Sequence, residues 1–373
     1  MVGKSLASAV TKEMLAALES HYSEVFVRSK CQVLVAGLVS LLGAGLLNAA
    51  ETPTQILPPS WPYAQPPLPP GVIPPQAQAP RTPAVSNPAA ANPNAPPPQL
   101  RQATGSKFEF TQQQISDSYG PADWFPEDHP PMPSLVARGK PGVARACGLC
   151  HLPSGRGRPE NAPVLGLPAD YIVQQLRDFQ QGLRHSAEPR KANTLEMENI
   201  AKTLSEEEIK EVAQYFSSVP KIKYIRVVET EMIPTMRIQG EIYFATGNGQ
   251  EEPLGNRIIE SPEDAAQTML RNPRSGFIAY VPIGSIKRGE ALATTGGGGK
   301  TTACSVCHGP DLKGLGPMPN LAGRSPSYLA RQLYDMKLGT RHGALAVLMK
   351  SVLANLTDND IVDLIAYVSS LDP

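Results

Sequence analysis

The sequence predicts a mainly α-helical protein built from two similar helical domains, with a small β-rich insert between them and a proline-rich tether before them. Three observations predict this: 373 residues exceed one ordinary domain of about 150; a pattern recurs along the chain; and 39 residues are proline, many in one stretch. The 34 basic and 34 acidic residues balance. A neutral chain lacks the basic face that a nucleic-acid-binding protein needs, so we expect no nucleic-acid partner.

Residues 1–50 have the pattern of an export signal. Basic residues at Arg28 and Lys30 precede an uncharged, mostly apolar segment, 31–50, that ends in small residues. The alternative is a retained membrane anchor, because about 20 apolar residues can span a bilayer. The glycines and the small-residue end favour cleavage, which would remove Cys31 with the signal. We therefore expect a periplasmic protein, tethered to the membrane through its N-terminus only if the signal is not cleaved.

The next segment, residues 51–107, is predicted to be a disordered tether. Prolines fill 17 of the positions 52–100, and Ala, Gln and Asn fill much of the rest. Such a composition favours an extended, polyproline-like chain that buries no core.

An internal repeat organises the remaining chain into domains 108–220 and 281–373. A shift of 157 residues superposes Cys147 on Cys304, and the shift becomes 152 after a gap of five residues. The paired positions are Cys147, Cys150 and His151 with Cys304, Cys307 and His308; Tyr171 and Gln175 with Tyr328 and Gln332; Arg184 and His185 with Arg341 and His342; and Met197 with Met349.

Each copy of the repeat is predicted to be helical. Apolar residues recur at helical spacing over 172–179 and again over 329–336. A further helix closes each copy, beginning with Ser205-x-x-Glu208 in the first and Thr357-x-x-Asp360 in the second. Between the copies, residues 221–280 break this pattern, and strands are expected at 224–228 and 238–244. We assign no chemistry to this insert.

Each copy contains one Cys-x-x-Cys-His motif, at 147–151 and at 304–308. Two thiols three residues apart can form thioethers with the two vinyl groups of one haem, and the next residue, His151 or His308, then ligates the iron. A zinc site is the first alternative, but it would have to join two separate repeats and leaves the histidines unexplained. A redox dithiol would need a βαβ setting. The motifs therefore predict two covalently bound haem c groups.

The sixth iron ligands are expected to be Met197 and Met349, because they align and each precedes a closing helix, where a loop could cross the second haem face. His185 and His342 also align and are the rivals. Arg184 and Arg341 are candidates for contacts with haem propionates. The alternative is that each arginine lies exposed at a helix end.

Both copies resemble class I cytochrome c domains, and the pair resembles bacterial periplasmic di-haem cytochromes of the c-four type. The resemblance covers about 134–220 and 281–373, and rests on both Cys-x-x-Cys-His motifs, on 319–323 (Pro-Asn-Leu-Ala-Gly), and on the two aligned methionines. It implies low-spin haems with histidine and methionine ligands, and electron shuttling in the periplasm. The tether and the insert between the copies depart from that family's pattern.

We therefore expect an electron carrier rather than an enzyme, with redox proteins in the periplasm or at the membrane as partners. A second hypothesis makes it the haem-bearing subunit of a periplasmic dehydrogenase, with the insert as docking surface. A third, from another class, is a di-haem peroxidase. That enzyme needs an open sixth position on one iron, and a candidate methionine in both copies argues against it.

Overall fold

The computed structural model describes residues 56–69, 71–78 and 97–373. The predicted signal at 1–50, the alternative membrane anchor and Cys31 lie outside these residues. Within the described ranges, no helix combines the length and the apolar character needed to cross a bilayer. Below, residues 108–220 are called the first repeat, 221–280 the insert and 281–373 the second repeat.

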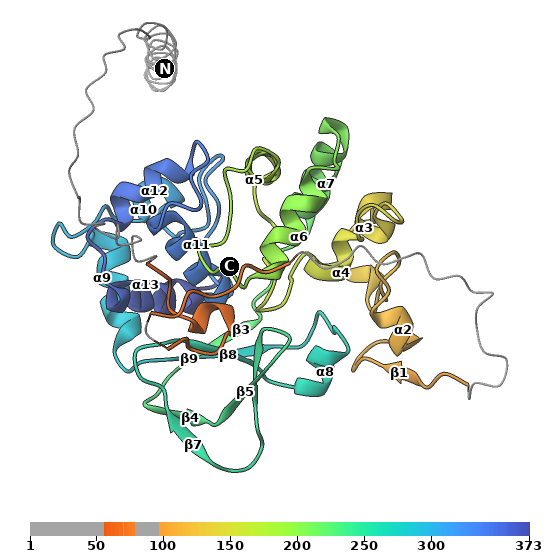
Figure 1. Cartoon of the computed structure of the whole chain (residues 1–373), viewed down its shortest axis with the longest axis horizontal. Coiled ribbons are helices and arrows are strands. Elements are labelled where there is room, and N and C mark those ends of the chain that lie inside the picture. The colour runs from red at the N-terminus through yellow and green to blue at the C-terminus, as the bar shows by residue number, and fades with distance from the viewer. Residues whose placement is uncertain (1–55, 70, 79–96) are drawn as a thin grey trace, which may run out of the picture. The chain divides into compact units, whose positions relative to one another are not determined.

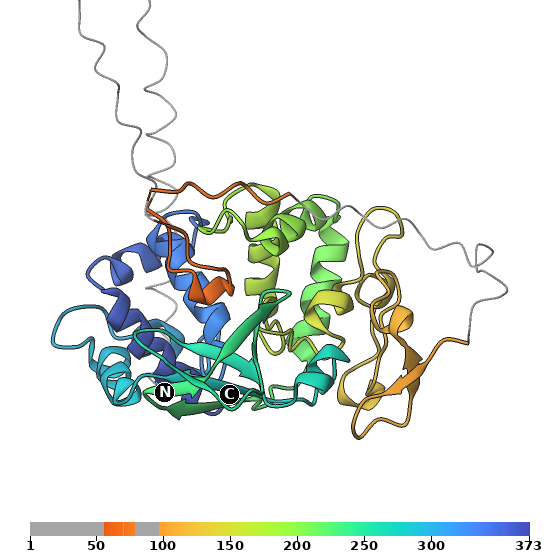
Figure 2. The same cartoon turned by 60° about the horizontal axis from the view of Figure 1, so that its bottom comes forward.

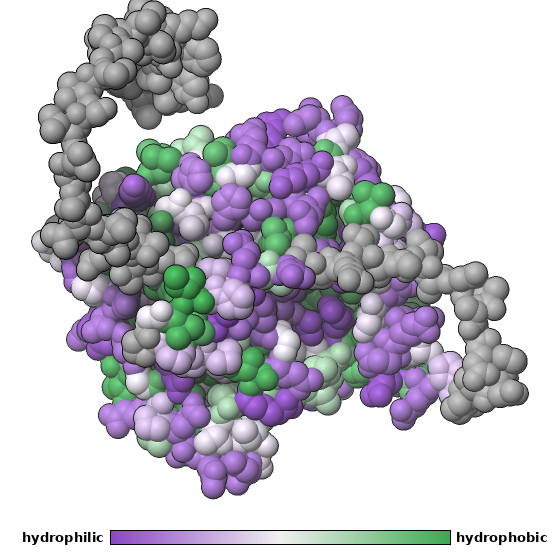
Figure 3. All heavy atoms as spheres, viewed as in Figure 1, coloured by the Kyte–Doolittle hydropathy of each residue, from purple (hydrophilic) through white to green (hydrophobic). Residues whose placement is uncertain are grey.

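The first repeat is helical, as predicted (Figure 1). Its longest helices, α5 (Ala169–Gln180) and α7 (Glu206–Ser218), pack against each other through apolar side chains that include Phe179 and Phe216. Ser205 accepts a hydrogen bond from the Glu208 amide in the predicted capping box. Hydrophilic side chains cover the outer surface over α7 (Figure 3). The shorter helices are α3 (Ser134–Arg138), α4 (Cys147–His151) and α6 (Ala192–Ala201).

The second repeat has a matching set of helices. Its closing helix α13 (Asp358–Ser370) crosses α9 (Ser285–Thr295) so closely that a Cβ at Gly289 would overlap the Asp363 carbonyl group. A glycine is therefore required at this crossing. The other helices are α10 (Ser305–His308), α11 (Pro326–Lys337) and α12 (Ala346–Leu353). The predicted helices over 329–336 and after Thr357 are thus confirmed.

The insert contains three small sheets and helix α8 (Ala265–Met269). The largest sheet has the order β3-β9-β8, with β3 parallel and β8 antiparallel to β9. The other two sheets are antiparallel pairs, β4 with β7 and β5 with β6. The strands are β3 (Ile225–Glu229), β4 (Met232–Pro234), β5 (Met236–Gln239), β6 (Ile242–Ala245), β7 (Glu251–Pro253), β8 (Ile259–Pro262) and β9 (Phe277–Val281).

One strand prediction in the insert is wrong. The strand expected at 224–228 is present as β3, one residue later. The single strand expected at 238–244 is instead a hairpin, because Gly240 and Glu241 both have positive φ angles, 57° and 59°, and reverse the chain between β5 and β6. Two consecutive positive φ angles fit the tight turns that match the twist of paired strands.

The insert packs on both repeats. Its residues Ile225, Ile258 and Phe277 share one apolar core with α9, α11 and α13 of the second repeat. Its other end, at α8, lies beside the segment 97–130 (Figures 1 and 2). There Trp124 donates a hydrogen bond from Nε1 to the Leu270 carbonyl oxygen at 2.7 Å. That segment holds β1 (Leu100–Gln102), β2 (Glu109–Thr111), α2 (Gln112–Ile115) and a 3₁₀ turn, η3 (Pro126–Asp128).

The structure differs from the prediction of a wholly disordered tether at 51–107. A 3₁₀ turn, η1 (Trp61–Tyr63), is buried against α11. The Tyr63 hydroxyl donates to Asp335 Oδ1 at 3.1 Å, and Arg331 donates to the Pro62 carbonyl oxygen at 2.7 Å. Two large aromatic side chains supply enough buried area to hold a proline-rich segment in place.

Candidate haem-attachment sites

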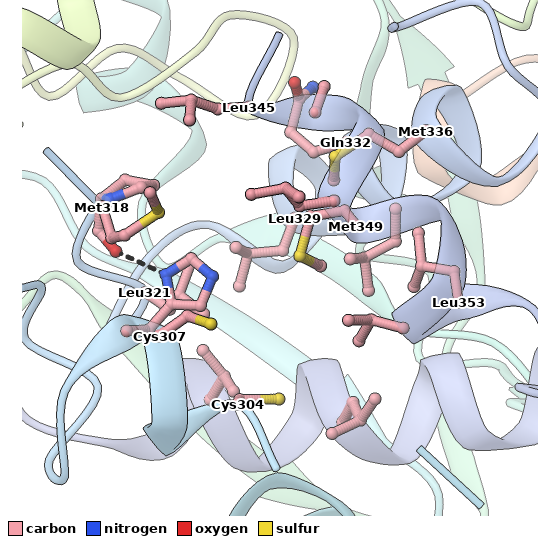
Figure 4. A pocket seen from close by; sticks show the side chains of 18 of the residues that line it. Cys304, Cys307, Met318, Leu321, Leu329, Gln332, Met336, Leu345, Met349 and Leu353 are labelled. Carbon is pink, nitrogen blue, oxygen red and sulfur yellow. Dashed lines mark hydrogen bonds between the residues drawn. The ribbon is translucent and has the colours of Figure 1, made fainter. Parts of the chain in front are cut away.

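The motif of the second repeat lines a pocket with mostly apolar walls. Helix α10 places Cys304, Cys307 and His308 on one side of this pocket, and α11, α12 and α13 form other walls. In Figure 4, Met349 lies across the pocket from Cys307, and Leu329 and Leu353 also line the pocket. The apolar lining includes Leu321, Leu329, Leu333, Met336, Leu353 and Ile365.

One nitrogen of His308 is already used by the protein. Its Nδ1 lies 2.8 Å from the Pro319 carbonyl oxygen, and since a carbonyl only accepts, Nδ1 carries the hydrogen. Burial lowers the pKa of His308, which favours the neutral ring. A neutral imidazole held through Nδ1 presents Nε2 as a ligand for a metal ion.

The first repeat shows the same arrangement. His151 Nδ1 lies 2.8 Å from the Ala162 carbonyl oxygen, and burial lowers the pKa of this histidine too. The acceptor follows the histidine by 11 residues in both repeats. In both motifs, therefore, Nδ1 is held by a backbone carbonyl and Nε2 is left to ligate a metal ion.

Three motif cysteines, Cys147, Cys150 and Cys304, are held as thiols. Burial raises the pKa of Cys147 to about 12 and that of Cys304 to about 11, and it also raises the pKa of Cys150. Among the residues that the structure describes, His, Cys, Asp and Glu form no cluster of three or more suited to a metal ion. Haem attachment thus remains the better interpretation of both motifs.

Met197 and Met349 lie on helices, not in the loops that we expected: Met197 on α6 and Met349 on α12. A helix still brings a side chain to the pocket wall. Met349 lines the pocket of the second repeat and packs on the same core as Cys304, while Met197 packs on the same core as Cys147.

Two other methionines, Met318 and Met336, also line the pocket of the second repeat. Met318 directly precedes Pro319, the partner of His308, and is drawn on the side of the pocket away from Met349 (Figure 4). Met336 is 7% exposed and belongs to the α11 core. Met349 therefore stays the predicted sixth ligand of the second repeat.

The rival histidines are placed elsewhere. His185 uses both ring nitrogens, with Nδ1 2.9 Å from Glu198 Oε1 and Nε2 2.7 Å from the Gly182 carbonyl oxygen. His342 is exposed and does not line the pocket. Neither ring is positioned as an iron ligand.

Arg184 and Arg341 are buried, so the alternative of exposed helix-end arginines is wrong. Both guanidinium groups donate to the aligned glutamines Gln175 and Gln332, at 2.8 to 3.1 Å, and Arg341 also donates to the Tyr171 hydroxyl at 2.9 Å. These acceptors are neutral. The two glutamines and Tyr171 were not predicted as site residues. The sequence marked them only as aligned positions of the two repeats, and that alignment was the feature that could have identified them.

This arginine pair leaves positive charge at the pocket wall. Arg341 lines the pocket, and its buried Nε atom has no hydrogen-bond partner in the structure. Burial alone would raise the pKa of Tyr171, but the charges of Arg341 and Arg184 outweigh that effect and lower it. The site can therefore accept a carboxylate.

Comparisons with known proteins relate the chain to cytochromes c. Residues 286–372 match the family model for cytochrome c. Cytochrome c-554(548) of Halomonas halodenitrificans is 42% identical over 83 residues, which are 22% of this chain and 96% of that protein. Cytochrome c4 of Azotobacter vinelandii is 26% identical over 235 residues, 62% of this chain and 86% of that protein. The thiosulfate dehydrogenase electron acceptor of Thiomonas intermedia is 28% identical over 222 residues, covering 58% and 75% of the two chains.

Proposed function

The chain belongs to the class I cytochrome c family, and from that premise we propose that it carries single electrons on two covalently bound haem c groups, one in each repeat. The observation that carries the proposal is the repeated histidine geometry. In each motif a buried, neutral imidazole donates through Nδ1 to a backbone carbonyl 11 residues later and presents Nε2 beside two cysteines. The first haem would be attached at Cys147 and Cys150 and the second at Cys304 and Cys307.

The residues of the second pocket fit such a group. Its thiols lie at one side, its walls are apolar, and Met349 lies across the pocket from Cys307. The unpartnered Arg341 Nε atom and the surplus positive charge beside Tyr171 suit the carboxylates that a haem carries. When bound, a haem supplies a reversible one-electron iron couple.

This chain's residues then set the conditions for that couple. The carbonyl of Pro319 fixes the ring orientation of His308. The leucines of α11 and α12 exclude water, and the sulfur of Met349 would raise the reduction potential relative to a histidine ligand. In the first repeat, His151 and Met197 take the corresponding roles, and Arg184 joins Arg341 as a partner for haem carboxylates.

A second function is the electron-accepting subunit of a periplasmic dehydrogenase. The observation that favours it is the similarity to a thiosulfate dehydrogenase electron acceptor. Co-purification of this chain with a catalytic subunit would distinguish the subunit from a free carrier. A di-haem peroxidase is disfavoured, because each repeat offers a methionine for the sixth position.

Export to the periplasm belongs to the same proposal. It rests on the signal-like residues 1–50 and on the two haem-attachment motifs. Cell fractionation, followed by N-terminal sequencing of the mature protein, would show whether the signal is cleaved and whether the chain stays at the membrane.

The central test is haem stoichiometry combined with an optical redox titration of the purified holoprotein. We expect two covalently bound haems per chain, and one after Cys147→Ser/Cys150→Ser or after Cys304→Ser/Cys307→Ser. Met197→Ala and Met349→Ala should each remove part of the near-infrared methionine–iron band and lower one potential. Met318→Leu is the matched control and should keep both. A single haem, or a band that survives both methionine substitutions, would contradict the proposal.

A further inference from the structure

The proline-rich segment that precedes the first repeat is packed against the second repeat and the insert. We call this segment, residues 56–69 and 71–78, the strap. Figure 2 shows it in red-orange, running from the helices of the second repeat toward those of the first. At its buried turn η1, Trp61 packs in the apolar core of the second repeat, and Ala64 packs in an apolar core of the insert that includes Ile233. The strap thus joins the second repeat to the insert.

The strap also reaches the first repeat. Arg190 donates from Nη1 to the Pro66 carbonyl oxygen at 2.9 Å, and the Ala77 amide donates to the Pro189 carbonyl oxygen at 2.7 Å. These two bonds hold the later part of the strap against the segment between α5 and α6. One segment without a charged residue is therefore bonded to both repeats.

Arg331 of α11 binds the strap and the first repeat at the same time. Its Nη1 atom donates to the Pro62 carbonyl oxygen of the strap, and its Nη2 atom donates to the Pro159 carbonyl oxygen of the first repeat, both at 2.7 Å. The side chain is buried. A buried guanidinium group needs acceptors for its hydrogens, and here they come from two separate segments, so loss of either segment leaves a donor unpaired.

Asp335, one helical turn further along α11, makes the same double contact through one oxygen. Its Oδ1 atom accepts a hydrogen bond from the Tyr63 hydroxyl of the strap at 3.1 Å and another from the Ala187 amide of the first repeat at 2.8 Å. Asp335 and Tyr63 are both buried. The strap, the first repeat and α11 thus meet at two adjacent buried polar side chains.

The two repeats differ at these positions. Under their alignment, Arg331 and Asp335 match Gln174 and Asp178 of α5. Gln174 donates to Asp178 Oδ1 at 2.8 Å, so these two side chains bond within one helix. The aligned pair in α11 reaches out to the strap and to the other repeat. Arg331 and Asp335 are therefore matched to contacts between segments.

The composition of the strap suits such contacts. A polyproline-like chain has no internal backbone hydrogen bonds, so its carbonyl oxygens are free to accept from arginines, as those of Pro62 and Pro66 do. Prolines also restrict the unbound chain, which lowers the entropy lost when the segment is ordered. Trp61 and Tyr63 supply buried area that keeps the segment in place.

The position of the first repeat also matters for the second haem site. Tyr171 and Gln175 of the first repeat line the pocket that contains Cys304 and Cys307. A movement of one repeat against the other would therefore change a wall of this pocket, and with it the arrangement of the two proposed haems.

We propose that the strap is a clamp that keeps the two repeats closed against each other, with Arg331 and Asp335 as its positioning residues. Each opening of the boundary between the repeats would remove first-repeat side chains from the wall of the second pocket and interrupt electron exchange between the two haems. This consequence rests on the proposed function, whereas the clamping itself rests on the contacts alone.

Hydrogen exchange of single amides in the ferrous holoprotein tests the clamp. The boundary amides, those of His185 and His342, each donate to a carbonyl oxygen of the other repeat, at 2.8 and 2.9 Å. The reference amides, those of the aligned Gly166 and Gly323, each donate to the closing helix of their own repeat at 2.9 Å. The ratio between the two kinds of exchange rate separates opening of the boundary from unfolding of a repeat.

Trp61→Ala/Tyr63→Phe loosens the strap by removing its large buried side chain and its bond to Asp335. We expect the boundary amides to exchange about tenfold faster relative to the reference amides, a factor that corresponds to 1.4 kcal/mol. The matched control is Ile56→Ala/Ile73→Ala, which changes two strap side chains that are 76% and 72% exposed and should leave the ratio unchanged.

A second pair of variants tests the positioning role of Arg331. Arg331→Met keeps a long apolar side chain but removes the bonds to the strap and to the first repeat, and it should also raise the ratio by about tenfold. Gln174→Met, at the aligned position of α5, removes a bond within one helix and should leave the ratio unchanged. Similar ratios in these two variants would show that Arg331 does not position the repeats.

Equal acceleration of the boundary and reference amides in the Trp61→Ala/Tyr63→Phe variant would overturn the proposal, because η1 would then support only the fold of the second repeat. A holoprotein dimer in sedimentation that this variant dissociates would also overturn it, since the strap would then join two chains. A failure of the proposed function looks different: a redox titration would show no reversible haem couple, while the exchange rates would still report on the boundary.

Discussion

Arg184 and Arg341 pair with each other as an antiparallel backbone bridge at the boundary between the two repeats. Two flanking hydrogen bonds extend it, from the His185 amide to the Thr340 carbonyl oxygen at 2.8 Å and from the His342 amide to the Leu183 carbonyl oxygen at 2.9 Å. Because aligned residues pair with one another, the repeats meet here in a twofold-like manner. The insert therefore does not keep the repeats apart, and both arginines lie where the wall of one site meets the other repeat.

This pairing predicts an effect of arginine charge on the reduction potentials. Arg341→Gln removes a buried positive charge beside the second pocket, which favours the oxidised, more positive iron and lowers the potential of that haem by about 60 mV, equivalent to about 1.4 kcal/mol for one electron. Arg341→Lys keeps the charge and should shift the potential less. An optical redox titration of both variants measures this, and equal potentials in wild type and Arg341→Gln would show that the charge does not reach the haem.

Asp335 predicts a dependence of stability on pH. Burial raises the pKa of this α11 carboxyl to about 6, although the Ala187 amide and the Tyr63 hydroxyl both donate to it. The folded state therefore holds the proton more tightly than the unfolded chain does. The free energy of unfolding falls as pH rises from about 4 to about 6, by up to about 3 kcal/mol from this group.

Asp335→Asn isolates that contribution. The amide oxygen can still accept both hydrogen bonds, and the side chain no longer titrates. Urea unfolding of both proteins at about pH 4 and about pH 7 should show the variant gaining up to about 3 kcal/mol over wild type at the higher pH. A difference between the two proteins that is independent of pH would contradict the raised pKa.

Local patterns were predictable from the sequence, and long-range contacts were not. The motif at 304–308 was predictable because its own spacing places two thiols and an imidazole close together once one turn of helix forms there. The capping boxes at Ser205 and Thr357 likewise depend on residues three apart. The loops expected around Met197 and Met349 are helices instead. A short helix and a loop that differ by one turn have almost the same sequence pattern, so the sequence could not separate them.

The missed features join distant parts of the chain. Arg271 reaches the Leu149 carbonyl group across 122 residues, and Tyr63 reaches Asp335 across 272. Nothing in the composition of a proline-rich segment marks Trp61 and Tyr63 as buried; only the surface of α11 decides that. The contact between the insert and the first motif could therefore not be predicted from the sequence, in which the insert had no assigned chemistry.

The buried turn η1 predicts that Trp61 and Tyr63 stabilise the second repeat. Trp61→Ala removes a large apolar side chain that is 7% exposed and should lower the free energy of unfolding by about 3 kcal/mol. Tyr63→Phe removes only the hydrogen bond to Asp335 and should cost about 1 kcal/mol. Chemical unfolding measures both, with Ile56→Ala, at a position 76% exposed, as control. Wild-type stability in Trp61→Ala would mean that η1 does not pack on α11 in solution.

Glu260 on β8 predicts how the insert supports the second site. Its Oε2 atom accepts from the Ser325 hydroxyl at 2.6 Å and from the Ser327 amide at 3.1 Å, so a buried carboxylate caps the start of α11. An anion there is also favoured by the helix dipole. Glu260→Ala leaves these donors without a partner and should lower the free energy of unfolding by about 2 kcal/mol, whereas Glu260→Gln keeps an acceptor and should lower it less.

Because α11 carries Leu329 and Met336 of the pocket wall, Glu260→Ala should also broaden or weaken the methionine–iron band of one haem while leaving the other intact. Loss of stability with both bands unchanged would limit Glu260 to holding the fold.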